Sequence, residues 1–221
     1  MKNYLSITVL LSSFLLLMAC SDSAVNNDTA DLLTQNSELE AEYRAPAPGD
    51  QTIAEIVVAS ASAEEGAEFT LLLAALEYTE LTGVFTGGGQ YTVFAPTDAA
   101  FGNLVTFVAP LLDEAGLEVF NNEGPFAAVD YLLGEGTVAN VLRYHVTEGR
   151  RAANSVVPNN PRAKERKIST LLEGASFTVN SDAGITAVGN SASILIPDLS
   201  ASNGIIHVID TVLLPVDLGL E

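Results

Sequence analysis

The sequence predicts an α+β fold in which helices come first and short strands follow. Apolar residues recur at helical spacing before residue 145, whereas short β-prone segments dominate after it. One strand in the first half also leads directly into a helix. A doubly wound sheet would alternate strands and helices throughout, so this order favours α+β. The segment 50–217 is long enough, in a chain that is 48% apolar, for one domain with its own core.

The helical half is predicted from two apolar stripes. Apolar residues lie at i, i+3 and i+4 from Ile53, and at i, i+3, i+4 and i+7 from Phe69. Three glycines at 87–89 then break the chain. Further helical turns are expected over 126–132 and 138–142.

The second half is predicted to be a series of short strands. They cover 168–172, 176–180, 185–188, 193–196 and 205–213. The turn Asn-Ser-Asp-Ala-Gly at 180–184 predicts a hairpin between the second and third of them. The last segment is apolar on both faces around His207, which is typical of an interior strand and gives this histidine a structural role.

The block Thr92–Phe101 joins a strand to a helix. The strand is predicted over 91–94 and ends at Pro96, which cannot donate to a ladder. Thr97 or Asp98 can then accept a hydrogen bond from an orphan backbone N–H at the start of the next helix. The block has the composition of a structural corner.

This block resembles the first signature of the fasciclin domain. The segment Asn203–Pro215 resembles the second signature, and Val141–His145 resembles the Tyr-His element between them. The three lie in the family's order, and the similarity extends over roughly 49–216. The resemblance implies a fasciclin-like fold, a β-sandwich wedge flanked by N-terminal helices. It also implies an extracellular adhesion module.

Through the same resemblance, Thr97, Asp98, Tyr144 and His145 become candidate binding residues. In fasciclin domains the Tyr-His element is associated with core integrity and with adhesion-receptor contact. His145, however, continues an apolar helical stripe that starts at Val138. From the residues alone, a core histidine and two capping residues are therefore the favoured interpretation.

The first twenty residues predict a bacterial lipoprotein. Lys2 precedes an apolar run over 4–18, and Leu-Met-Ala-Cys at 17–20 resembles a lipobox. We expect a signal peptide over 1–19 and acylation of Cys20, since two or three acyl chains hold a protein to a membrane. Ser21 after the cysteine favours the outer membrane, facing either the periplasm or the outside. An uncleaved anchor and a secretory signal with a free thiol are the alternatives.

The segment 20–49 is predicted to be a disordered linker, and 218–221 a short tail. The linker is acidic, poor in aromatic residues, and closed by Pro46 and Pro48, which stiffen its end. It can lift the domain from the lipid surface, or serve as a spacer without a partner.

Charge excludes nucleic acid and anionic headgroups as general partners. The chain has 28 Asp and Glu against nine Lys and Arg, for a net charge of −19. Seven of the nine basic residues lie between 143 and 167, where only Glu148 and Glu165 oppose them. This segment is interpreted either as a solvated loop or as a docking site for an acidic polysaccharide, a phosphate group or a second copy. Its candidate binding residues are Arg150, Arg151, Arg162, Lys164, Arg166 and Lys167.

No catalytic or metal motif is present in the sequence. There is no G-x-S-x-G elbow, no phosphate-binding lysine after the glycines at 87–89, and no calcium-loop signature. Two histidines in dissimilar settings give no zinc site. We expect no enzyme activity, cofactor or metal, although the 28 acids of the chain are compatible with a glycosidase carboxylate pair.

The function favoured by the sequence is therefore a lipid-anchored cell-envelope module for adhesion or matrix binding, recognising protein or polysaccharide. The alternative is a carrier of an apolar small molecule, because 70–81 and 101–117 are richer in apolar residues than core packing requires. A carbohydrate-active enzyme is the least favoured class.

Overall fold

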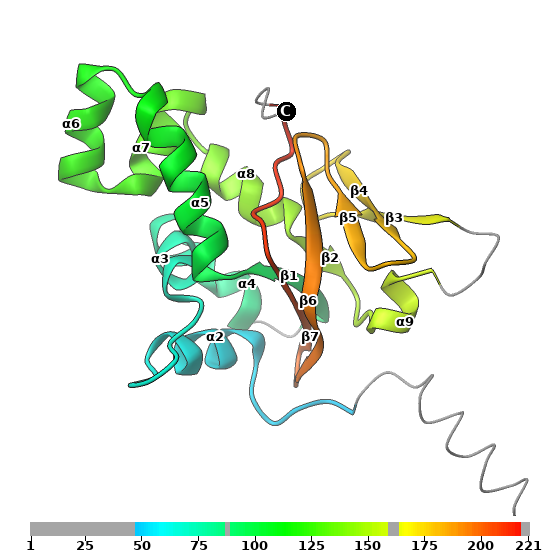
Figure 1. Ribbon diagram of the computed structural model, residues 1–221. Helices are drawn as coiled ribbons and strands as arrows, with labels where there is room; N and C mark the ends of the chain where they lie inside the picture. The colour runs from blue at the N-terminus through cyan, green and yellow to red at the C-terminus, as the bar shows by residue number, and fades with distance from the viewer. Residues whose placement is uncertain (1–46, 87–88, 159–163, 218–221) are drawn as a thin grey trace, which may run out of the picture. The chain divides into compact units, whose positions relative to one another are not determined.

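The computed structural model describes residues 47–86, 89–158 and 164–217 (Figure 1). Its helices are α2 (Ile53–Ala61), α3 (Thr70–Tyr78), α4 (Thr82–Thr86), α5 (Asp98–Val108), the 3-10 helix η1 (Ala109–Leu111), α6 (Glu114–Glu123), α7 (Pro125–Leu133), α8 (Thr137–Tyr144) and α9 (Ala153–Val156). Its strands are β1 (Tyr91–Pro96), β2 (Val146–Glu148), β3 (Glu165–Ser169), β4 (Ser176–Asn180), β5 (Gly184–Thr186), β6 (Ser191–Ala201) and β7 (Gly204–Ile209). Helices precede most of the strands, which confirms the predicted α+β class.

The sheet has seven strands in the order β2-β1-β7-β6-β5-β4-β3. The pair β1 and β7 is parallel and every other pair is antiparallel. The long strand β6 belongs to both halves of the sheet, and its register shifts between Ile194 and Ile196 and again before Leu199. Such irregularities bend a strand, which lets the two halves face each other.

The two ends of the sheet meet just beyond β3. The N–H of Leu171 donates to the carbonyl of Val146 at 2.7 Å, so the chain leaving β3 contacts the edge strand β2. An apolar cluster fills the space between the halves and includes Phe94 from β1 and Phe177 from β4, whose ring centroids lie 4.9 Å apart. This arrangement agrees with the predicted wedge.

A second and larger apolar core lies between the helices and the other face of β1 and β7. It contains Ile53 of α2, Leu72 of α3, Phe101 of α5 and Ile206 of β7, all buried. Figure 1 shows the helices gathered on this side of the sheet, away from β3, β4 and α9. Both predicted helical stripes therefore pack toward one core.

Several predicted boundaries were wrong for identifiable reasons. A strand was predicted at 168–172, but β3 covers 165–169. The charged residues of its first half obscure the alternation of apolar and polar residues by which a strand is recognised. The strand expected at 193–196 extends to 191–201, and Pro197 is tolerated where the register shifts. The strand expected to reach 213 ends at Ile209. The hairpin between β4 and β5 was predicted correctly.

The domain contacts begin within the segment predicted as a linker. A Cβ on Gly49 would lie 2.3 Å from the carbonyl oxygen of Ser200, so the glycine allows a close approach of two backbones. The carbonyl of Gln51 accepts from the N–H of Ser202 at 2.7 Å. The predicted signal peptide, Cys20 and the rest of the linker lie outside the described residues, as does the tail 218–221.

Candidate binding surface

The corner after β1 holds two capping residues with different targets. The hydroxyl of Thr97 accepts from the N–H of Ala100 at 3.2 Å and caps α5, as predicted. Asp98 instead reaches α3, which has no capping side chain of its own. Its carboxylate accepts from the N–H groups of Thr70 and Leu71 at 3.1 and 2.9 Å. Asp98 therefore fixes the starts of two helices relative to each other.

Tyr144 lies in the interior of the wedge. Its side chain is fully buried, and its hydroxyl donates to the carbonyl of Ser176 at 3.0 Å. Its ring packs edge-on against Phe177 at 5.8 Å. Burial raises the pKa of this tyrosine. The side chain thus joins α8 to β4 from the inside.

His145 is buried beside it and is hydrogen-bonded at both ring nitrogens. Nδ1 lies 2.7 Å from the carbonyl of Val141, and Nε2 accepts from the N–H of Leu213 at 2.8 Å. The proton therefore belongs on Nδ1. Burial lowers the pKa of His145 to about 4, so the ring is neutral at ordinary pH. A partner could contact Tyr144 or His145 only after the core opens.

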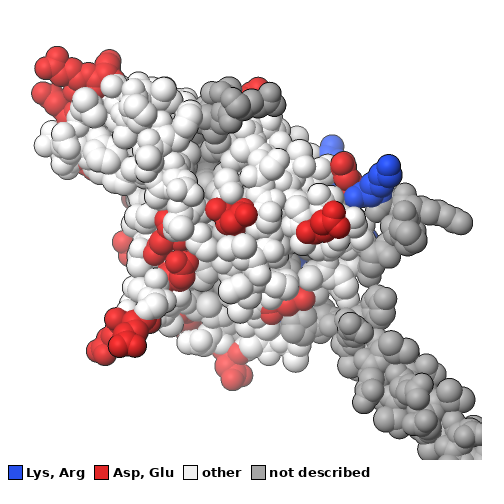
Figure 2. All heavy atoms as spheres, viewed as in Figure 1, with Lys and Arg blue, Asp and Glu red and all other residues white. Residues whose placement is uncertain are grey.

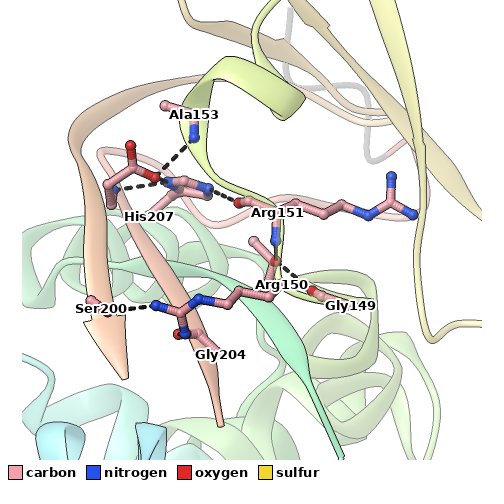
Figure 3. Close-up of polar contacts among 9 residues, drawn as sticks. Gly149, Arg150, Arg151, Ala153, Ser200, Gly204 and His207 are labelled. Carbon is pink, nitrogen blue, oxygen red and sulfur yellow. Dashed lines mark hydrogen bonds and ion pairs between the residues drawn. The ribbon is translucent and has the colours of Figure 1, made fainter. Parts of the chain in front are cut away.

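The first part of the basic segment, residues 149–156, is held by side chains from neighbouring strands (Figure 3). The hydroxyl of Thr92 on β1 donates to the carbonyl of Gly149 and accepts from the N–H of Arg151, at 2.7 and 2.8 Å. His207 on β7 donates from Nε2 to the carbonyl of Arg151 at 3.0 Å. The main chain here is therefore bonded to buried polar groups.

The same histidine is tied to a strained residue. Its Nδ1 accepts from the N–H of Asp198 at 3.2 Å, and burial lowers the pKa of His207. Asp198 has a φ of 62°, which is unusual for a residue with a side chain. In this conformation its carboxylate accepts from the N–H of Ala153 at 2.8 Å and holds the start of α9. These contacts confirm the structural role expected for His207.

The arginines of the segment are engaged with the backbone. Arg150 is half-buried and donates to the carbonyls of Ala201, Gly204 and Ala47, at 2.7, 2.5 and 3.2 Å. It thereby joins the segment to the β6–β7 hairpin and to the start of the described chain, and burial lowers its pKa. Arg151 donates from Nε to the carbonyl of Glu148 at 3.2 Å.

The remaining basic candidates lie on or next to β3. Arg166 is half-buried and donates to the carbonyl of Ser155. Lys164 and Lys167 are exposed. Arg162 lies outside the described residues. The structure therefore separates the predicted loop into arginines that hold the fold and two exposed lysines, which we call the β3 lysines; the exposed Glu165 lies between them in the sequence.

The rest of the molecule is acidic. Between residues 45 and 142 the sequence has no Lys or Arg, and the acids there number 14. Figure 2 shows red side chains spread over the visible surface and blue ones confined to the margin beside β3. Acidic residues therefore occur on both the helical side and the sheet side, whereas the basic residues of the described chain are confined to 143–167.

The apolar interior offers little room for a ligand. Voids lined by Ile53, Leu76 and Phe85, or by Phe101, Phe126 and Leu214, have volumes of about 20 and 30 Å³. A small-molecule site needs roughly 300 Å³ or more. Next to Asp217 there is a larger depression of about 530 Å³, but it is open and bordered by the turn 186–191. None of these spaces in the described residues resembles a closed apolar site, which weakens the carrier hypothesis.

The described ranges contain neither a candidate metal site nor a candidate membrane-spanning helix. No group of three or more His, Cys, Asp or Glu side chains there could hold a metal ion. No helix in the same ranges is both long and apolar enough to cross a bilayer.

Comparison with known proteins identifies the family. A family model of the fasciclin domain matches residues 67–215, so the chain belongs to the fasciclin domain family. The uncharacterized protein sll1735 of Synechocystis is 30% identical over 148 residues, which cover 66% of this chain and 89% of that protein. The immunogenic protein MPB70 of Mycobacterium bovis is 32% identical over 58% of this chain and 51% of its own length.

A solved structure supports the fold. The fasciclin domain pair of the insect cell adhesion molecule fasciclin I superposes with a TM-score of 0.54 at 17% identity. The match covers 76% of this chain and 51% of the insect chain, so the protein spans about half of that pair. The family is associated with adhesion and extracellular proteins and is generally non-catalytic.

Proposed function

We propose that this protein is a lipid-anchored module of the bacterial cell envelope that serves adhesion or matrix binding. Its support is the fasciclin domain, the lipobox-like Leu-Met-Ala-Cys ending at Cys20, and the acidic segment between lipid and domain. Ser21 favours the outer membrane, and adhesion requires that the domain face outward. In this proposal the lipid on Cys20 attaches the protein to the membrane, and the domain contacts an envelope or matrix component.

The β3 lysines are the binding site in this proposal. Lys164 and Lys167 are exposed on either side of Glu165 in the sequence, and the described chain has no Lys or Arg outside 143–167. In a strongly acidic domain this basic segment is where an anionic partner such as an acidic polysaccharide is least repelled. This exposed pair of lysines is the observation that carries the proposed function.

Retention on an immobilised polyuronate at 0.15 M salt tests the binding surface. The variant Lys164→Ser with Lys167→Ser is expected to lose about threefold in affinity per lysine, the size of an exposed ion pair of roughly 0.7 kcal/mol. Arg143→Ser, which removes an exposed charge from α8, is the matched control and should change little. Equal retention of the double variant and the control would refute the binding surface.

The anchor and its orientation have a separate test. Radiolabelled palmitate should enter the wild-type protein and not the Cys20→Ala variant. External protease should remove the domain from intact cells. Absence of label would refute the lipid anchor, and protection from protease would refute an adhesive role at the cell surface.

A further inference from the structure

The ring of His207 joins segments that are distant in the sequence. It is fully buried on β7, and its centroid lies 5.3 Å from that of Phe94 on β1. Its Nδ1 accepts from the N–H of Asp198 at 3.2 Å, and its Nε2 donates to the carbonyl of Arg151 at 3.0 Å (Figure 3). A main-chain N–H can only donate and a carbonyl can only accept, so both contacts require a neutral ring with its proton on Nε2.

A protonated ring cannot keep this arrangement. The added proton on Nδ1 would face the N–H of Asp198, and two donors would meet. The carboxylate of the same residue offers an acceptor, because its Oδ1 lies 4.0 Å from Nδ1. A shift of about 1 Å brings this oxygen to hydrogen-bond distance from the ring. That oxygen already accepts from the N–H of Ala153 at 2.8 Å, so the shift would break the contact that holds the start of α9.

The backbone of Asp198 favours such a movement. Its φ of 62° lies in the left-handed region, which is disfavoured for a residue with a side chain. The residue belongs to the irregular stretch between Ile196 and Leu199, where the register of β6 against β7 shifts. Its N–H bonds to the ring of His207. Protonation of the ring therefore removes a contact that holds this disfavoured conformation.

Charged side chains reach the neighbourhood of the ring from three elements. They are Asp198 of β6, Arg150 and Arg151 of the segment 149–156, and Arg166 of β3, which donates to Ser155 of α9. From β1 the ring meets the apolar Phe94. The arginines and burial oppose a charged ring, whereas the carboxylate favours it. Burial is the largest of these effects and lowers the pKa of His207 below the ordinary 6.5, so protonation requires acid.

The other buried histidine differs in its contacts. Both ring nitrogens of His145 bond to the backbone, at Val141 and Leu213, and burial lowers its pKa to about 4. A carboxylate near a ring favours the charged form. The side chain of Asp198 is also 31% exposed, which gives the proton a route from solvent. His207 is therefore expected to take up its proton at a higher pH than His145.

We propose that protonation of His207 by solvent moves the carboxylate of Asp198 from the N–H of Ala153 to the imidazolium and frees the start of α9. Nε2 remains a donor in the charged ring, so the contact with Arg151 persists and the opening begins at Ala153. The closed state is fully populated above pH 6.5 and is lost as the pH falls through the folded pKa of the ring. The domain thus contains an acid-sensitive switch within its basic segment.

NMR of the full chain in detergent, from pH 8 down to the onset of unfolding, tests the switch. The His207 ring should titrate below 6.5 and above the midpoint of His145. Over the same range, hydrogen exchange of the Ala153 amide, corrected for its intrinsic pH dependence, should speed by about tenfold through loss of one hydrogen bond. The amide of Arg151 donates to the hydroxyl of Thr92 and should not change.

The variant Asp198→Asn removes the charge and keeps an oxygen that can accept from Ala153, and asparagine tolerates the positive φ. Its His207 should titrate at a lower pH, and its Ala153 amide should stay protected. Asp210→Asn removes the same charge next to β7, where the carboxylate accepts from the N–H of Ser193, and should behave as wild type does.

Three results would overturn the inference. They are a His207 ring that stays neutral until the domain unfolds, an Ala153 amide that stays protected while the ring titrates, and an Asp198→Asn variant that opens as wild type does. The first two are measured on the wild-type protein, so they decide the matter even if Asp198→Asn does not fold.

Discussion

Acidification should destabilise the domain through His145. The ring is 3% exposed, and its Nε2 accepts from the N–H of Leu213. A protonated ring has two donors and no acceptor, so this hydrogen bond cannot persist. Because the folded pKa of about 4 is below the ordinary 6.5, the unfolded chain takes up the proton first as pH falls. The contribution of the neutral His145 ring to the free energy of unfolding is therefore fully present above pH 6.5 and is lost as the pH falls toward 4.

The size of the effect follows from the same values. The difference between 6.5 and about 4 corresponds to about 3 kcal/mol, at roughly 1.36 kcal/mol for each pKa unit. Most of this should disappear between pH 7 and pH 4.5. Urea unfolding at several pH values measures it, with the His145→Gln variant as the comparison. A glutamine can accept and donate as the neutral ring does but does not titrate in this range.

We expect His145→Gln to be less stable than wild type at pH 7 and to lose less stability on acidification. The carboxylates titrate equally in both proteins, so the difference between the two slopes isolates the histidine. Parallel pH profiles for wild type and His145→Gln would refute the buried neutral ring. A ring titration in NMR with a midpoint near 6.5 would refute it independently.

Three substitutions test individual contacts and backbone strain within the domain. Asp98→Ala should cost about 1–2 kcal/mol in chemical unfolding, because α3 loses its cap, and a cost near zero would contradict that role. Arg150→Ala should speed amide exchange at Ser202, since the carbonyls of Ala201 and Gly204 lose their donor; unchanged exchange would show that the hairpin does not depend on it. Ala183→Gly should raise the thermal midpoint, because Ala183 has a φ of 60° and glycine removes strain of about 1 kcal/mol; a lower midpoint would contradict this.

The local structure could largely be predicted from the sequence. The strand ending at Pro96, the cap at Thr97 and the turn at 180–184 depend on neighbouring residues only. The same local logic missed β2 and α9, which are three and four residues long and too short to show a period. Helix α6 was missed as a separate element because it buries only Gly116 and so lacks an apolar stripe.

Contacts between residues far apart in the sequence could not be predicted in the same way. Asp98 caps a helix that begins 28 residues earlier, and Arg150 donates to carbonyls more than 50 residues away. The backbone carbonyls that Arg150 contacts cannot be identified from the sequence, so the sequence alone did not distinguish Arg150 from Lys164 and Lys167. Only the packing of the strands decides which basic side chains turn inward.

The parallel pairing of β1 with β7 has a consequence for biosynthesis. Tyr91 pairs with Gly204 and Pro96 with Ile209, so the centre of the sheet joins segments separated by most of the domain. Contacts so distant in sequence form slowly, because a long loop must close first. A chain growing from the ribosome therefore cannot complete its central sheet until Ile209 has emerged. Through nearly all of its synthesis the domain remains an incomplete fold, the state that a translocation channel for unfolded chains can accept.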